Sequence, residues 1–94
     1  MKRLCYDNTA TFETYHDAVK ELLDVGNNVS LVISKKGESK LLQCDIYGVY
    51  HVNDYERYVP TGWYDLYTFD NIQHGLTLPD LLKRVVELSL IYWN

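Results

Sequence analysis

Cysteine and histidine are the side chains of this sequence best suited to nucleophilic catalysis or metal binding, but their spacing supports neither. His16, His51 and His74 are isolated, and neither Cys5 nor Cys44 has a ligand-like neighbour, whereas metal sites place their ligands at short, regular intervals. Cys44 and His51 could pair as nucleophile and base, but their opposite parity along one strand directs them to opposite faces. We therefore predict no metal, no cofactor and no catalytic residue.

Motifs for phosphate binding and ester hydrolysis are missing as well. The five glycines stand singly, so the chain has neither a P-loop nor a dinucleotide-binding fingerprint, and it has no Gly-x-Ser-x-Gly elbow. Four carboxylates in the middle of the chain could supply an acid–base pair, but carboxylates in turns and on the outer face of a sheet are usually solvated. We therefore expect the protein not to be an enzyme.

The middle of the chain nevertheless concentrates unusual side chains. The net charge of −4 comes entirely from residues 45–70, which contain five acidic residues and one basic residue, Arg57. These acids are Asp45, Asp54, Glu56, Asp65 and Asp70. Six of the nine tyrosines lie in the same segment, with Trp63 and Phe69 among them. Negative charge and aromatic surface therefore coincide along the sequence.

This coincidence favours a protein partner over a nucleic acid. Six neighbouring tyrosines cannot all face one small core, and exposed Tyr and Trp are typical anchors of protein interfaces. Aromatic sheets also stack nucleic-acid bases, but they need positive charge to attract phosphates, so we expect no direct nucleic-acid binding. The predicted binding residues flank two expected chain breaks: the anchors Tyr55, Tyr58, Trp63 and Tyr64, and the steering acids Asp54, Glu56 and Asp65.

The helices that must support this region are indicated by periodicity. Apolar residues at helical spacing behind Thr14, which can cap a helix, predict a helix over residues 15–25, and Gly26 ends it. Thr77 provides a second cap, Pro79 is tolerated in the first turn, and an apolar stripe predicts a helix over 78–91.

The strands are indicated by alternation. Residues 29–34 predict one strand, 40–52 a long second strand with a bulge or a close approach at Gly48, and 63–69 a third. Residues 2–6 add a possible short edge strand, and breaks are expected at 53–54 and at 59–62. In the long strand, one face is predicted to hold Leu42, Cys44, Ile46, Tyr50 and Val52. The predicted core includes Leu22, Val29, Leu31, Ile33, Leu81, Leu82 and Val85.

Together these elements predict an α+β fold in one domain, residues 1–94. The order α-β-β-β-α implies a three- to four-stranded antiparallel sheet with both helices packed on one face. We expect neither a membrane span nor a signal peptide, because no long apolar run is present and none follows the basic pair at the start, and we therefore expect a soluble cytoplasmic protein. In that reducing compartment both cysteines are expected to be small buried hydrophobes; their pairing and the oligomeric state stay open.

A short, acidic, Tyr-rich α+β chain without catalytic residues is similar, by analogy only, to the small inhibitors that phages and mobile elements encode, anti-CRISPR proteins among them. Bacterial immunity proteins, which occupy the active site of a nuclease, have the same physical profile. The leading hypothesis is an inhibitor that binds a basic, nucleic-acid-handling enzyme. The alternatives are an immunity or antitoxin protein for a partner toxin, and a non-catalytic phage structural or assembly protein.

Overall fold

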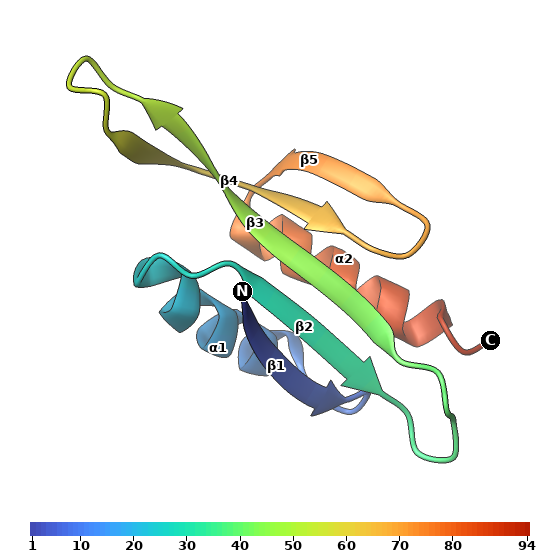
Figure 1. Ribbon diagram of the computed structural model, residues 1–94. Coiled ribbons are helices and arrows are strands. Elements are labelled where there is room, and N and C mark those ends of the chain that lie inside the picture. The colour runs from blue at the N-terminus through green and yellow to red at the C-terminus, as the bar shows by residue number, and fades with distance from the viewer.

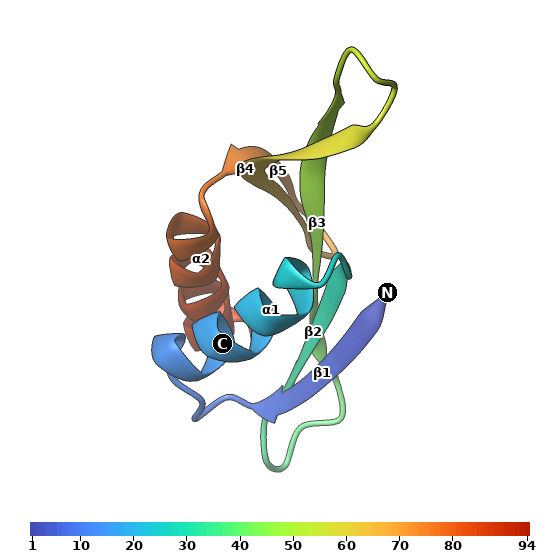
Figure 2. The same ribbon diagram turned by 90° about the vertical axis from the view of Figure 1, so that its left-hand side faces the viewer.

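A five-stranded sheet with two helices on one face organises the computed structural model, which describes residues 1–94 (Figures 1 and 2). The strands lie side by side in chain order, β1 to β5. The elements are β1 (Lys2–Asp7), α1 (Phe12–Asp24), β2 (Val29–Ser34), β3 (Leu42–Val52), β4 (Tyr58–Tyr67), β5 (Ile72–Leu76) and α2 (Leu78–Ile91). The α+β class is confirmed.

The sheet differs from the prediction because it is mixed and has five strands. Strand β1 runs parallel to β2, and the other neighbouring pairs are antiparallel. The parallel pairing follows from α1, which carries the chain back over the sheet between β1 and β2. Strand β5 was not predicted, because Gln73, His74 and Gly75 lack apolar alternation and suggested a loop instead.

The break predicted at residues 59–62 is also wrong, because these residues lie inside β4. They form a bulge: Gly48 pairs with Tyr64 and Tyr50 pairs with Pro60, so three residues of β4 face one residue of β3. Gly62 adopts a φ of 83°, which an L side chain rarely adopts. Glycine at position 62 therefore permits a bulge within a continuous strand. The extra residues lie on β4 and not at Gly48 of β3, where the close approach that the sequence also suggested is to the Tyr50 ring.

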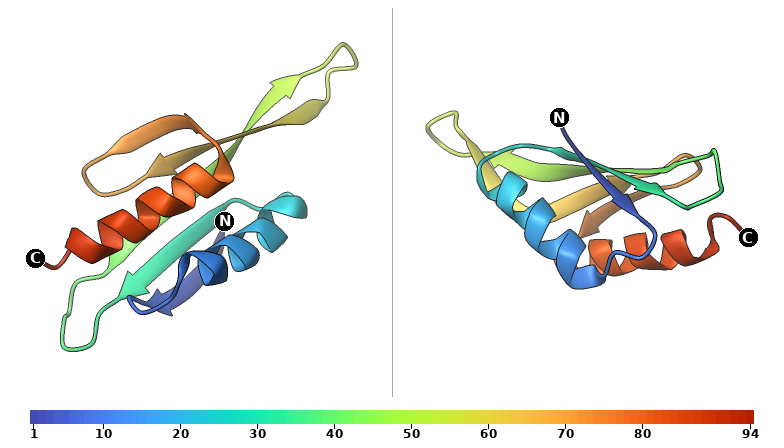
Figure 3. Two further views of the ribbon diagram at one scale, coloured as in Figure 1. Left: turned by 180° about the vertical axis from the view of Figure 1, so that it is seen from behind. Right: turned by 90° about the horizontal axis from the view of Figure 1, so that it is seen from below.

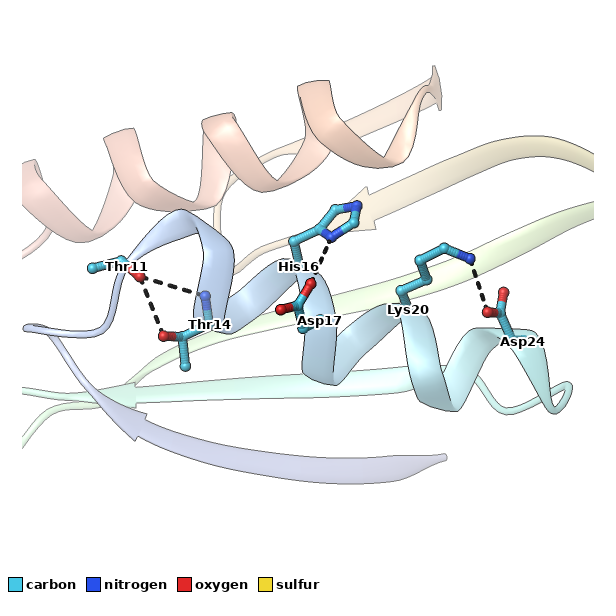
Figure 4. Close-up of polar contacts among 6 residues, drawn as sticks. All are labelled: Thr11, Thr14, His16, Asp17, Lys20 and Asp24. Atoms are coloured by element: carbon cyan, nitrogen blue, oxygen red, sulfur yellow. Dashed lines mark hydrogen bonds and ion pairs between the residues drawn. The ribbon is translucent and has the colours of Figure 1, made fainter.

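Helix α1 begins one turn earlier than predicted. Thr11, not Thr14, is the cap: the Thr11 hydroxyl accepts a hydrogen bond from the Thr14 amide at 3.4 Å and lies 3.2 Å from the Thr14 hydroxyl (Figure 4). The added turn contains Phe12, which packs against the core and so stabilises the earlier start. Gly26 follows the helix with a φ of 87°, as its position predicted.

Helix α2 matches its prediction. It spans residues 78–91, the Thr77 hydroxyl accepts from the Asp80 amide at 3.3 Å, and Pro79 lies in the first turn. Full burial of Leu82 confirms the predicted phase of the apolar stripe.

A single cluster of 13 buried residues fills the space between sheet and helices. Of the predicted core residues only Leu22 is not fully buried, although it packs against the cluster. Tyr15 is also completely buried, and its hydroxyl has no hydrogen-bond partner in the chain. The core therefore lies under β2, the first half of β3 and the end of β4, and it stops where β3 passes Gly48.

Candidate protein-binding arm

The outer half of the β3–β4 hairpin projects beyond both helices, and we call residues 49–63 the arm (Figures 1, 2 and 3). The arm makes the molecule elongated, with extents of 52 × 23 × 19 Å. None of the buried residues lies in it. Its side chains are therefore available to a partner. The conformation of its backbone is held at two places, the base and the tip.

The base of the arm is held by local hydrogen bonds and close packing. The Thr61 hydroxyl donates to the Val49 carbonyl across the hairpin at 2.8 Å and accepts from the Trp63 amide at 3.2 Å. The Tyr50 ring lies over Gly48, where a Cβ atom would approach the ring to 3.1 Å. A single hydroxyl thus joins both strands beside the bulge, and glycine makes room for the ring.

The tip of the arm is organised by one side chain. The Asn53 side-chain oxygen accepts from the amides of Tyr55 at 2.9 Å and Arg57 at 3.0 Å, and the Asn53 amide donates to the Arg57 carbonyl at 2.9 Å. Glu56 adopts a φ of 58°, which is uncommon outside glycine, asparagine and aspartate. The turn predicted at Asn53-Asp54 is confirmed, and it presents its side chains from an ordered loop.

Five of the seven predicted binding residues lie in the arm. Tyr55 and Tyr58 are 84% and 78% exposed, and Asp54 and Glu56 are exposed beside them at the tip. Trp63 is 49% exposed at the base, where it lines a small hollow together with Leu23 of α1. These residues form two groups along the arm, one at each end.

The other two predicted binding residues, Tyr64 and Asp65, are part of the folded body. Tyr64 is half-buried and packs against the core. The Asp65 carboxylate accepts from the Gly75 amide at 3.1 Å and lies 3.2 Å from the His74 ring nitrogen Nδ1, so it joins β4 to β5. Truncating either residue is therefore expected to lower the stability of the fold, which the other five predicted binding residues do not support in this way.

Two arm residues that the sequence placed on the core face are exposed. Tyr50 pairs with Pro60 and Val52 pairs with Tyr58, so all four share one face of the arm. Tyr50 is 41% and Val52 56% exposed, because no helix covers the hairpin beyond Gly48. Strand length is the signal that could have predicted their exposure. An 11-residue strand next to a six-residue strand must extend beyond its neighbour.

The acids of residues 45–70 do not gather in space. Asp54 and Glu56 lie at the arm's tip with Arg57, which leaves the arm a net charge of −1 from two acids and one base. Asp45 and Asp65 lie on β3 and β4 within the sheet body, and Asp70 lies in the β4–β5 turn. Acid and aromatic surface therefore coincide in two separate places, at the arm's tip and on the helix-free face of the body, where Asp45 and Asp65 share one face with the paired residues Tyr67 and Tyr47.

The three histidines lie on separate parts of the fold. His16 is on α1, His51 in the arm and His74 on β5, and no three His, Cys, Asp or Glu side chains cluster as metal ligands would. Cys44 is buried, and desolvation raises the pKa of its thiol to about 12, so it stays protonated. Cys5 is exposed on β1, contrary to prediction, and both thiols are free.

Comparison with known protein families, curated proteins and solved structures finds no match to this chain. Neither α1 nor α2 has the length and apolar character that a membrane-spanning helix needs. Function is therefore inferred from the chain's own surface.

Proposed function

We propose that the protein is an inhibitor that inserts its arm into a basic, nucleic-acid-binding site of a partner enzyme. The observation that carries this proposal is the exposed face formed by Tyr50, Val52, Tyr58 and Pro60, which has no core beneath it. Side chains of this kind lose contact with water only when a partner covers them. Exposed apolar surface with a polar rim marks interaction sites in small soluble proteins.

The arm's construction favours tight binding. Tyrosine buries a large area while few rotatable bonds are fixed, and such anchors dominate interface energies. The Asn53 hydrogen bonds and the Thr61 bridge already order the backbone in the free protein, so little conformational entropy remains to be lost on binding. A two-stranded hairpin is also narrow enough to enter a groove shaped for nucleic acid.

The charge at the tip favours a basic partner. Asp54 and Glu56 are exposed and adjoin the anchors Tyr55 and Tyr58. Carboxylates in this position can take the place of phosphates and speed the approach to a positive site. A net charge of −1 on the arm is too small to imitate a duplex, so the acids are proposed to steer approach while the aromatic side chains supply affinity.

The proposed setting is the cytoplasm, with a phage or mobile element as the source, by analogy with anti-CRISPR inhibitors. An immunity protein for a nuclease toxin is the alternative that uses the same arm in the same way, since a nuclease site is also basic. An assembly role would instead use a broad flat face. The identity of the captured partner separates these possibilities.

A site-specific photo-crosslinking experiment tests the proposal. The photoreactive amino acid p-benzoylphenylalanine replaces Tyr58 in one variant and Leu90, which is 70% exposed on α2, in a matched control. We expect the Tyr58 variant, and not the Leu90 variant, to crosslink a nucleic-acid-binding enzyme in host extract, and the purified protein to inhibit that enzyme. Crosslinking from position 90 alone, or a captured protein whose activity is unaffected, would contradict the proposal.

A further inference from the structure

The two edges of the sheet differ in how well they are protected against pairing with another strand. An edge strand presents unpaired backbone N–H and C=O groups, which folded proteins usually block. The β5 edge is short, contains Gly75 at a φ of 68°, and shifts register against β4. The β1 edge has no such irregularity: its six residues pair with β2 in unbroken register and include neither glycine nor proline.

The geometry of β1 identifies the groups that point outward. The Lys2 amide donates to the Asn28 carbonyl at 2.8 Å, so Lys2 directs its backbone toward β2. In a parallel pair alternate residues of one strand bond to the other strand, and the backbone groups of Arg3, Cys5 and Asp7 therefore point away from β2. Of these groups the Asp7 carbonyl is already used, since it accepts from the Ala10 amide at 3.3 Å. The side chains of Arg3, Cys5 and Asp7 lie on the face without helices, because Leu4 and Tyr6 pack against the core.

The outward-pointing residues are complementary to a second copy of the same strand. In an antiparallel pair centred on Cys5, Arg3 of one copy lies opposite Asp7 of the other, Leu4 opposite Tyr6, and Cys5 opposite Cys5. Directly opposite residues share a face, and opposite charges in that position attract. Arg3 forms no ion pair within its own chain, so its charge is free to meet this partner.

The Asp7 carboxylate is held by local hydrogen bonds in a form that can pair with Arg3 of the second copy. The Thr9 hydroxyl and the Thr9 amide, the latter at 2.9 Å, both donate to one carboxylate oxygen of Asp7. These bonds hold the pKa of the carboxyl below its ordinary value, so it is charged at neutral pH. They also leave the second carboxylate oxygen without a hydrogen bond inside the chain.

From these observations we infer that β1 is a dimerisation edge, at which two copies of this chain pair antiparallel about Cys5. The two sheets then join into one continuous sheet with the helices of both copies on the same face. The outward groups supply about four backbone hydrogen bonds per dimer, because the Asp7 carbonyl already accepts from the Ala10 amide at 3.3 Å. This inference does not rest on the arm, which points away from the β1 edge and stays free in the dimer (Figure 2).

The test is sedimentation equilibrium of the full chain under reducing conditions, from micromolar to millimolar concentration. We expect a concentration-dependent dimer, and we expect Cys5→Pro to abolish it, because proline removes an outward N–H and no bond to β2. The matched control Cys5→Ser keeps every backbone group and should dimerise like the wild type. Circular dichroism confirms that both variants are folded.

Charge exchange tests the register. Arg3→Glu and Asp7→Lys alone place like charges opposite each other twice per dimer, so each should weaken the dimer about tenfold. The double variant restores opposite charges and should recover most of the affinity. Diamide, which takes two electrons and two protons from a pair of thiols, should crosslink wild-type chains through Cys5 and leave buried Cys44 unmodified.

Three results would overturn the inference. They are a monomer at every concentration, a dimer that survives Cys5→Pro, and single charge variants that the double variant does not rescue. None of these results bears on the crosslinking at Tyr58, so failure of the dimer and failure of the proposed inhibitory function are distinguishable.

Discussion

Strands β3 and β4 run through both the body of the sheet and the arm, but the side chains on one face of these strands are buried in the body and exposed in the arm. In the first half of β3, Leu42, Cys44 and Ile46 are completely buried, whereas Tyr50 and Val52 continue the same alternation and are 41% and 56% exposed. The difference is the helices, which cover the face up to Gly48 and not beyond it. Alternation therefore shows which side chains share a face, and only the neighbouring elements decide whether that face is a core or an interface.

The largest expected effect lies in the body. Leu82→Ala removes a completely buried side chain of α2 and should lower the free energy of unfolding by about 2–5 kcal/mol. The matched control Leu90→Ala, on the exposed side of the same helix, should change it by no more than about 0.5 kcal/mol. Urea denaturation measures both. Equal losses of unfolding free energy in the two variants would mean that the buried face of α2 is not the one seen in the structure.

The next effect separates two neighbouring tyrosines of β4. Tyr58→Ala in the arm should cost about 2 kcal/mol or more of partner binding, mainly through faster dissociation, and leave stability unchanged. Tyr64→Ala should instead reduce stability, because Tyr64 packs against the core.

Once a partner is known, surface plasmon resonance and urea denaturation of both variants check this contrast. A Tyr58 variant that loses stability, or a folded Tyr64 variant that loses binding as strongly as Tyr58→Ala, would remove the distinction between arm and body.

A pair of acids provides the third comparison. Asp65→Ala removes the acceptor of the exposed Gly75 amide, and it should cost about 0.5–1.5 kcal/mol of stability, the usual net contribution of one hydrogen bond. Asp54→Asn should leave stability within about 0.5 kcal/mol but slow association with a basic partner and flatten its salt dependence. Thermal unfolding and association rates at two salt concentrations distinguish the two roles. A stable Asp65→Ala variant would show that the carboxylate does not hold β5.

The smallest effect concerns a polar atom in the core. The buried Tyr15 hydroxyl has no partner in the chain, so Tyr15→Phe should raise stability at neutral pH by up to about 1 kcal/mol. Desolvation raises the pKa of Tyr15 from 10.0 to about 12, which favours the protonated folded state. That contribution is complete below pH 10 and is lost as pH rises toward 12.

Stability measured from pH 7 to 12 therefore should fall less steeply for Tyr15→Phe than for the wild type. Cys44, whose pKa is also raised, contributes to the remaining loss above pH 9. Identical alkaline profiles for the two proteins would show that Tyr15 ionises as readily in the folded as in the unfolded chain.

What could be predicted from the sequence depended on how many local signals agreed. For α2 the Thr77 cap, Pro79 and the apolar stripe agree, and the prediction matched. For α1, Thr11 and Thr14 offer equivalent caps, and only the packing of Phe12 decides between them. The parallel direction of β1 and the existence of β5 depend on tertiary pairing that no local pattern records.

The candidate site could also be predicted only in part from the sequence. The tip residues were found because a turn with flanking aromatics is a local signal. Tyr50 and Val52 were missed and Asp65 was misplaced, because the first two depend on where the helices end and the third on a strand that was not expected.

The bulge at Gly48 and Gly62 also has a consequence for how this protein can change. Because the hydrogen bonds of Asn53 and Thr61 close within the hairpin, residues nearer the tip can be added or removed in facing pairs with little effect on the body. A chain in which Asn-Gly joins Gly48 directly to Tyr64 should fold, since a two-residue turn suits such a pair. The bulge therefore separates the body from the arm, so that hairpins of other lengths and sequences can be grafted onto the body. The choice of target can then evolve independently of folding.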